Sequence, residues 1–179
     1  QTLLLRNIID LGLKNLYLKD EGMLPTGTFK ARGATVGVSM AKELGINTVA
    51  IPTVGNAGEA WAAYCAKAGI KLHVVMPKDA LEINKRECLS LGAELYLLDG
   101  LLSDASKIVS QWAKERKWFS AATLFEPYRI EGKKTMGFEI AEQFNWNLPD
   151  VIIHPCGGAV GIISIWKALK ELQKLGWVD

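Results

Sequence analysis

The sequence predicts an α/β fold, in which helices cover both faces of an open parallel sheet. Short apolar runs alternate with helix-like segments along most of the chain, which is typical of parallel strands joined by right-handed crossovers. The chain has 179 residues, of which 49% are hydrophobic and 22% charged. This length and composition indicate a globular protein with a substantial core.

Five short runs have the length and composition of strands. Turn-forming or helix-starting residues follow each run, and the last run is the richest in β-branched residues. We expect strands at residues 16–19, 48–51, 72–76, 94–98 and 151–154.

Segments with helical spacing of apolar residues lie between and after these runs. Gly45, Gly69 and Gly92 stand where three of the segments end, as expected for helix C-termini. We expect helices at residues 28–44, 57–68, 80–91, 102–117, 129–145 and 160–175, a further helix over Leu3–Ile9, and extended or irregular chain at 118–125.

The charge and hydropathy patterns exclude several classes of partner. A net charge of +2 without a basic run gives no reason to expect a nucleic acid. The sequence has no run of about 18 apolar residues, as a membrane span would need, and its first residues lack the features of a signal peptide. We therefore expect a cytoplasmic protein that binds neither nucleic acid nor membrane.

The cysteines and histidines do not suggest a metal site. Cys65, Cys88 and Cys156 are widely spaced and form no CxxC pair, and His73 and His154 lie at no metal-like spacing. We expect three reduced thiols, at least two of them buried, in a cytosolic protein.

Lys30 is the first candidate for catalysis. It ends the segment Pro25-Thr26-Gly27-Thr28-Phe29-Lys30 and opens a predicted helix. The partial positive charge of a helix N-terminus favours a neutral amine over an ammonium, and only the neutral amine attacks an aldehyde. A solvated lysine in a first helical turn is the alternative, but the turn and its two hydroxyls would fix this amine.

Asn56 is the second candidate, in Thr53-Val54-Gly55-Asn56-Ala57-Gly58. Its side-chain amide could bond a ligand oxygen, and Gly55 and Gly58 would let the backbone approach that ligand. A helix cap is an equally good interpretation of this residue taken alone.

The third candidate is the glycine loop Cys156-Gly157-Gly158-Ala159-Val160-Gly161. Successive amides at a helix N-terminus bind anions, and glycines remove the side chains that would block a phosphate. Neither the GxGxxG pattern of dinucleotide-binding folds nor the Gly-Lys-Ser/Thr of a Walker A loop is present. An aldehyde-bearing phosphate ester would satisfy all three candidates, and pyridoxal phosphate has that chemistry.

Longer motifs resemble a known family. Residues 18–33 (LKDEGMLPTGTFKARG), 126–135 (EPYRIEGKKT) and 149–158 (PDVIIHPCGG) are similar to motifs of the threonine synthases, as is the closing 165–169 (IWKAL). These belong to the fold type II pyridoxal-phosphate enzymes, the group of the tryptophan synthase β-subunit. The resemblance covers essentially the whole chain.

The resemblance implies a role for each candidate. Lys30 would be the Schiff-base lysine and proton shuttle, and Asn56 would bond the 3-oxygen of the pyridine ring. Arg129 would bind the phosphate of O-phosphohomoserine, with the hydroxyl of Thr53 nearby. The cofactor phosphate would lie on the main-chain amides of Gly157, Gly158, Ala159, Val160 and Gly161.

The implied reaction converts O-phosphohomoserine and water to threonine and phosphate. The sequence departs from the family's usual pattern in three places: Ala57 replaces a threonine, Ala159-Val160 replaces Gly-Thr, and Glu126 places negative charge where the substrate phosphate would come. A serine or threonine dehydratase on the same scaffold, or a domain without catalysis, therefore remains an alternative.

Family members are about twice as long as this chain, which implies a truncated sequence. By analogy, residues 20–140 would form the small domain, 1–19 an N-terminal part of the large domain, and 141–179 the start of its second part. The residue that meets the pyridine nitrogen would lie outside this chain. A sheet left with an open edge would favour self-association, so we expect a homo-oligomer that takes a small amino-acid substrate.

Overall fold

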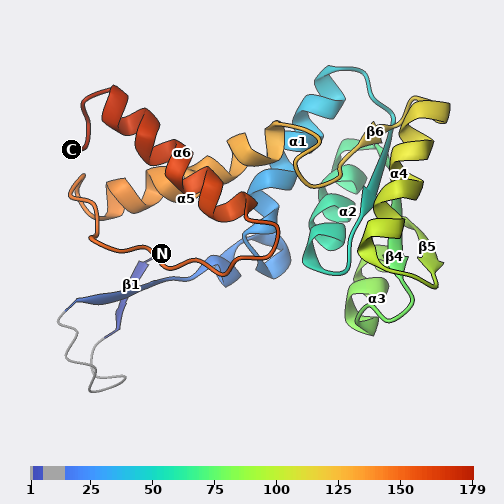
Figure 1. Cartoon of the computed structure of the whole chain (residues 1–179), viewed down its shortest axis with the longest axis horizontal. Helices are drawn as coiled ribbons and strands as arrows, with labels where there is room; N and C mark the ends of the chain where they lie inside the picture. Colours follow the sequence, from blue (N-terminus) through green and yellow to red (C-terminus); the bar gives the residue numbers. More distant parts are fainter. Residues whose placement is uncertain (1, 6–14) are drawn as a thin grey trace.

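The computed structural model describes residues 2–5 and 15–179 (Figure 1). Two short 3-10 turns, Glu21–Met23 and Pro25–Gly27, precede the first helix. The strands are β1 (Thr2–Leu5), β2 (Leu16–Lys19), β3 (Thr48–Pro52), β4 (Lys71–Pro77), β5 (Glu94–Leu98) and β6 (Phe119–Ser120). The helices are α1 (Lys30–Glu43), α2 (Asn56–Ala68), α3 (Glu82–Ser90), α4 (Leu102–Arg116), α5 (Tyr128–Gln143) and α6 (Val160–Lys174).

The centre of the fold is a parallel sheet with strand order β5-β4-β3-β6. Helix α4 packs on one face, and α1, α2 and α3 lie on the other (Figure 1). Successive residues of β3 point to opposite faces: Val49 and Ile51 join the core beneath α1 and α2, whereas Ala50 packs with Val75 beneath α4. The predicted α/β class, with helices on both faces of a parallel sheet, is confirmed.

A helical layer extends from one side of this body. Helix α5 packs against both α1 and α6 (Figure 1). Met136 and Ile140 of α5 form an apolar cluster with Ile165 of α6. Glycines allow close contact: a Cβ on Gly132 of α5 would overlap the carbonyl oxygen of Arg32 in α1. The layer therefore fixes α5 tightly beside the helix that begins at Lys30.

One predicted strand is absent, and another lies outside the sheet in which it was expected. Residues 151–154 form no strand, and the side chain of Ile153 is 90% exposed. Their β-branched residues favour extended backbone, but a strand needs a neighbouring strand to accept its hydrogen bonds, and the described residues place none beside them. The run at 16–19 does form a strand, yet it lies outside the parallel sheet.

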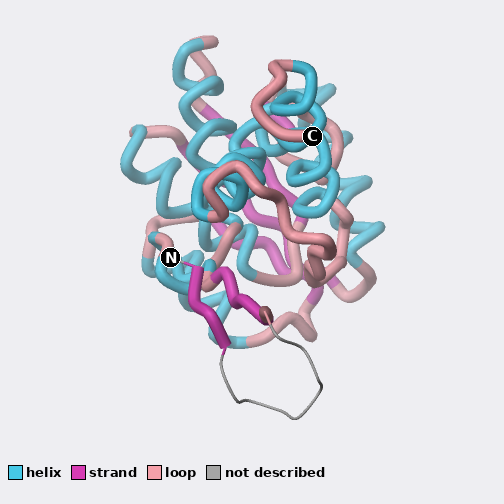
Figure 2. Tube along the Cα trace, turned by 90° about the vertical axis from the view of Figure 1, so that its left-hand side faces the viewer, coloured by secondary structure: helices cyan, strands magenta, loops and turns pink. Residues whose placement is uncertain are grey.

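The N-terminal prediction also needs correction. Residues 3–5 belong to β1, which pairs antiparallel with β2 in a hairpin apart from the main sheet (Figure 2). Cross-strand pairing decided the structure where a leucine-rich run fits a helix or a strand equally well. The rest of the predicted helix, residues 6–9, lies outside the described residues.

The predicted burial of at least two free cysteines is confirmed, because Cys65 and Cys88 are buried, whereas Cys156 is exposed. None of the helices in the described part of the chain has both the length and the apolar character that a membrane span requires.

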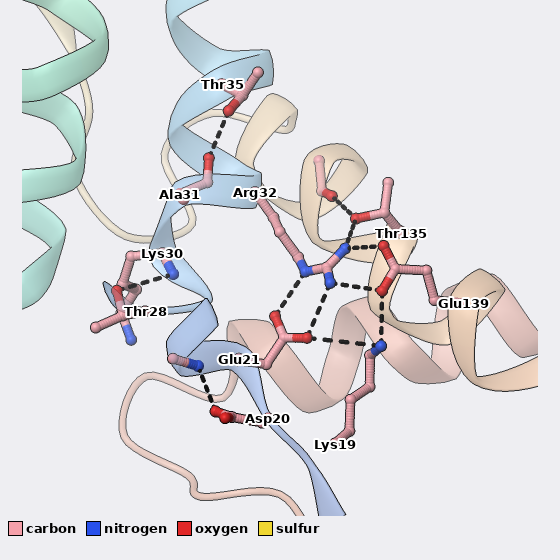
Figure 3. A network of polar contacts seen from close by, with 12 residues as sticks. Lys19, Asp20, Glu21, Thr28, Lys30, Ala31, Arg32, Thr35, Thr135 and Glu139 are labelled. Carbon is pink, nitrogen blue, oxygen red and sulfur yellow. Dashed lines mark hydrogen bonds and ion pairs between the residues drawn. The ribbon is translucent and has the colours of Figure 1, made fainter. Parts of the chain in front are cut away.

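A polar network joins α1 to α5 and to the chain that leads into Lys30 (Figure 3). Arg32 donates from Nε to Glu21 at 2.6 Å and from Nη1 and Nη2 to the two carboxylate oxygens of Glu139 at 2.7 Å each. Lys19 donates to the same carboxylate at 2.7 Å, and Thr135 accepts a further bond from Arg32. The network holds the first turn of α1 in place.

Acid should weaken this network. Hydrogen bonds from Arg32, and then from Lys19, lower the pKa of Glu139 to about 2 against the opposing effect of burial. The network's stabilisation is then complete above pH 4.5, the ordinary pKa of the group, and is lost as the pH falls toward 2. Because the side chain is 37% exposed, we expect Glu139→Gln to cost only about 1 kcal/mol at neutral pH.

Urea unfolding of Glu139→Gln at several pH values would check this prediction. The variant should lose less stability than the wild type between pH 4.5 and 2. Glu142→Gln, an exposed neighbour on α5, serves as the control and should follow the wild type. If the free energy of unfolding fell equally in the wild type and in Glu139→Gln between pH 4.5 and 2, the prediction would be contradicted.

Candidate functional site

Lys30 is the first residue of α1, as predicted. Its amide donates to the hydroxyl of Thr28 at 3.3 Å, and its ammonium lies 3.7 Å from the centre of the Phe29 ring. Burial, followed by the positive charge of Arg129, lowers the pKa of Lys30. The pKa therefore shifts in the expected direction, toward a neutral amine, through burial and the charge of Arg129.

The glycine loop leads into α6 without a strand before it. The first turn of the helix closes with a bond from the Ile163 amide to the Ala159 carbonyl at 3.1 Å. The amides that precede Ile163 have no acceptor within the helix. A Cβ on Gly161 would lie 2.6 Å from Nε2 of His154, so only glycine fits between the loop and that ring.

One cleft of about 410 Å³ brings these segments together. Phe29 and Lys30 line it from the start of α1, and Arg129 and Lys133 line it from α5. The glycine loop (156–161) and the two residues before it, His154 and Pro155, also line the cleft. Lys30 and the predicted phosphate loop, which are more than a hundred residues apart in sequence, thus face the same space.

Asn56 and Thr53 are not among the residues that line this cleft. Asn56 is exposed at the start of α2, next to Ala57, which does line the cleft. Its Oδ1 accepts a hydrogen bond of 3.1 Å from Nδ2 of Asn84, a residue that is 4% exposed. The hydroxyl of Thr53 bonds the backbone of Gly55, both as donor and as acceptor.

Arg129 lines the cleft but is already paired. Its Nε donates to Glu126 at 2.8 Å, and the backbone amide of Arg129 donates to the other oxygen of that carboxylate. Its remaining nitrogens donate to the carbonyl of Ala121 and to the hydroxyl of Thr123. Both partners of the Glu126–Arg129 ion pair are buried, so the negative charge noted in the sequence neutralises this arginine.

Lys133 is a residue of the cleft that the sequence analysis missed. It follows Arg129 by four residues, which places both on one face of α5. Its side chain is 3% exposed and lies 5.3 Å from the centre of the Phe29 ring. Its i, i+4 spacing from Arg129 within EPYRIEGKKT was the available signal, since it sets Lys133 apart from the adjacent Lys134.

The residues of the cleft fit an aldehyde-bearing phosphate ester. Lys30, Arg129 and Lys133 bring three basic side chains to the cleft, and the carboxylate of Glu126 is bound to Arg129. Nδ1 of His154 is buried without a hydrogen-bond partner among the described residues. Buried polar atoms of this kind normally have a partner, and the helix amides and His154 together leave hydrogen-bonding capacity for a bound anion.

Ala159 shows strain at the loop. It has a φ of 57°, in the left-handed region that favours glycine. We expect Ala159→Gly to stabilise the protein by about 0.5–1 kcal/mol, since relief of the left-handed conformation exceeds the added entropy of the unfolded chain. Urea unfolding measures the change. Ala62→Gly inside α2, at a helical position, should destabilise instead, and a loss of stability in Ala159→Gly would contradict the assignment of strain.

Comparisons with known proteins agree with this geometry. Residues 2–177 match the family described as pyridoxal-phosphate dependent enzyme. The threonine synthase of Methanocaldococcus jannaschii is 42% identical over 171 residues, which are 95% of this chain and 42% of that protein. The threonine synthase of Methanosarcina acetivorans is 44% identical over 170 residues, which are 94% of this chain and 42% of that protein. This chain thus spans less than half the length of these two relatives.

Solved structures show the same fold. A crystal structure of O-ureido-L-serine synthase superposes with a TM-score of 0.86 at 22% identity, over 97% of this chain and 57% of that one. A hydrogen sulfide-producing enzyme of Fusobacterium nucleatum gives a TM-score of 0.85 at 26% identity, over all of this chain and 60% of that one.

Proposed function

We propose, from the premise that this chain belongs to the pyridoxal-phosphate-dependent enzyme family, that it carries the reactive lysine of a lyase resembling threonine synthase. The proposed reaction converts O-phosphohomoserine and water to threonine and phosphate. The observation that supports it is the cleft that Lys30, the glycine loop and Arg129 line together. The similarity to two threonine synthases over most of the chain supports the same choice.

Bound pyridoxal phosphate supplies an aldehyde that an amine can attack and a ring that withdraws electrons from an attached amino acid. Lys30 would hold the cofactor and then move protons at the substrate. Its lowered pKa raises the fraction of neutral amine near pH 7, which both tasks need. The contact with Phe29 and the first turn of α1 fix the amine in the cleft.

The start of α6 would hold the cofactor phosphate. Its amides have no acceptor within the helix, and the helix dipole adds positive potential at this end. The amides of Gly157, Gly158, Ala159, Val160 and Gly161 are the proposed donors. His154 could donate a further hydrogen bond from the buried Nδ1.

Asn56 would bind the ring oxygen of the cofactor through its amide nitrogen. Asn84 already donates to Oδ1 of Asn56, which leaves the amide N–H groups of Asn56 to face a ligand. Arg129, although paired with Glu126, still adds donors to the wall of the cleft where an anionic substrate would lie.

A product assay tests the proposal. The purified protein is loaded with pyridoxal phosphate and given O-phosphohomoserine, and phosphate and threonine are measured together. Equal amounts of both support the proposal. Ketoacid formation from serine or threonine, without phosphate release, would instead support a dehydratase, which the neutralised charge of Arg129 favours. Absence of both activities would contradict a catalytic role for this chain.

We also propose that the protein assembles as a homo-oligomer. Large apolar side chains on the 151–154 segment and on α6 remain exposed, among them Ile153 and Trp166. Exposed apolar surface of this kind favours association. Light scattering at working concentration should give at least a dimer, and a monomer would contradict the proposal.

A further inference from the structure

Lys133 has a position that packing alone does not explain. Its side chain lies buried between α5 and α1, where a Cβ on Gly33 would be 3.1 Å from its Cε. Lys133 lines the cleft that Lys30 and the glycine loop also line. No hydrogen bond or ion pair reaches its ammonium from the residues that the structure describes, and its one ring contact is with Phe29.

The charges around Lys133 make a charged side chain at this position unfavourable for the stability of the fold. Burial, then Arg129, then Lys30 lower the pKa of Lys133 to about 7, while Glu126 acts weakly in the opposite direction. A buried charge without a partner destabilises a folded protein. A methionine would fill the same space without that cost, so packing alone gives no reason for a lysine here.

The neighbouring arginine cannot supply the same charge. The carboxylate of Glu126 neutralises the charge of Arg129, and carbonyl and hydroxyl oxygens accept further hydrogen bonds from its guanidinium. Lys30 would be occupied by the cofactor under the proposed function. Among the described residues that line the cleft, Lys133 then stays a basic group without a charged partner when the cofactor is bound.

We infer that Lys133 is a substrate-binding residue, whose ammonium binds the dianionic group of a phosphomonoester substrate beside the cofactor. This inference rests on the proposed function and deepens it, since it assigns the selectivity for a phosphorylated amino acid to Lys133 rather than to Arg129 alone. A charge-assisted hydrogen bond to a dianion would then give the ammonium the partner that it lacks.

Inorganic sulfate is a suitable probe, because it carries two charges throughout the neutral range. Sulfate is titrated by calorimetry into the protein loaded with pyridoxal phosphate, in which the glycine loop is already filled. We expect Lys133→Gln and Lys133→Met to weaken sulfate binding by about tenfold or more. The control Lys134→Gln, whose side chain pairs with Glu171 and Glu131 instead, should bind sulfate as the wild type does.

Proton linkage gives a second readout. At pH 8 most of Lys133 is neutral, and a bound dianion would favour its charged form, so wild-type binding should take up close to one proton. Calorimetry in buffers of different ionisation enthalpy measures this uptake, which Lys133→Met should abolish. The other titratable or charged groups that face Lys133 or line the cleft are Lys30, Glu126, Arg129, His154 and Cys156.

Stability separates a binding role from a structural one. The folded-state pKa lies below the ordinary 10.5, so the wild type should gain stability as the pH rises from 7 toward 10. Lys133→Met should remove this dependence and raise the Tm at pH 7. A lower Tm in Lys133→Met, with unchanged sulfate affinity, would overturn the inference in favour of a structural lysine.

Further outcomes keep this inference separate from the proposed function. Borohydride reduction and mass spectrometry first establish whether the cofactor is on Lys30, and failure of that step counts against the proposed function alone. Sulfate titration of the cofactor-free protein then still compares the wild type with Lys133→Gln. If Lys133→Gln weakens cofactor binding but leaves sulfate affinity intact, Lys133 serves the cofactor and the inference is wrong.

If neither variant folds, the wild type is acetylated with and without sulfate. Sulfate should protect Lys133 from acetylation, and lack of protection overturns the inference.

Discussion

Lys30→Ala should abolish covalent attachment of pyridoxal phosphate and lower any turnover by about 10³-fold or more. The reason is that the substitution removes the amine that would both hold the aldehyde and move protons at the substrate. The fold should persist, since the Lys30 ammonium makes a contact with Phe29 and no ion pair in the described part of the chain. Borohydride reduction followed by peptide mass spectrometry measures the attachment.

The matched control is Lys42→Ala, an exposed lysine on the same helix. It should keep the label on the peptide that contains Lys30. A label that persists in Lys30→Ala, for example on Lys133, would show that another amine of the cleft carries the cofactor. Circular dichroism spectra that match the wild type would show that loss of the label is not loss of fold.

Gly132→Ala should destabilise the protein by about 2–3 kcal/mol. The added methyl group would overlap the carbonyl oxygen of Arg32 and lie 2.9 Å from the carbonyl carbon of that residue and 3.0 Å from Cα of Gly33. All three atoms belong to the backbone of α1, so α1 and α5 must separate. The higher helix propensity of alanine offsets only about 1 kcal/mol of this cost.

The same substitution should weaken the site. Lys30 lies on α1, whereas Arg129 and Lys133 lie on α5, so a shift between the two helices changes how these cations face one another. Urea unfolding measures the stability, and retention of pyridoxal phosphate after gel filtration measures the site. Gly157→Ala, where an added Cβ meets no atom within 4 Å, should leave stability near the wild-type value. A Gly132→Ala protein as stable as the wild type would contradict the close approach of α1 and α5.

The fold could be predicted where the local sequence pattern and the tertiary packing favour the same secondary structure. Apolar runs such as 48–51 and 72–76 became strands because helices cover both faces of the sheet and bury them on either side. Residues 151–154 have an equally strong strand pattern, but no strand lies beside them among the described residues. The hairpin of β1 and β2 was missed because its pairing depends on two short segments together. Neither segment has a sequence pattern that indicates the pairing.

The site could be predicted in part, for a similar reason. Lys30 and the glycine loop follow local rules, since each opens a helix after a turn-rich segment. Lys133, His154 and Asn84 depend on contacts between distant segments, which no single window of sequence displays. The pairing of Glu126 with Arg129 was visible as a spacing of three residues, but only burial shows that it neutralises the arginine.

The amine of Lys30 and the loop at Gly157–Gly161 are proposed to bind one cofactor from two sides of a cleft. A crystal structure of the protein soaked in pyridoxal phosphate tests this most directly. We predict continuous density from Nζ of Lys30 to the cofactor, with its phosphate on the first amides of α6. Density that joins the cofactor to a different lysine, or a phosphate bound away from α6, would contradict the account.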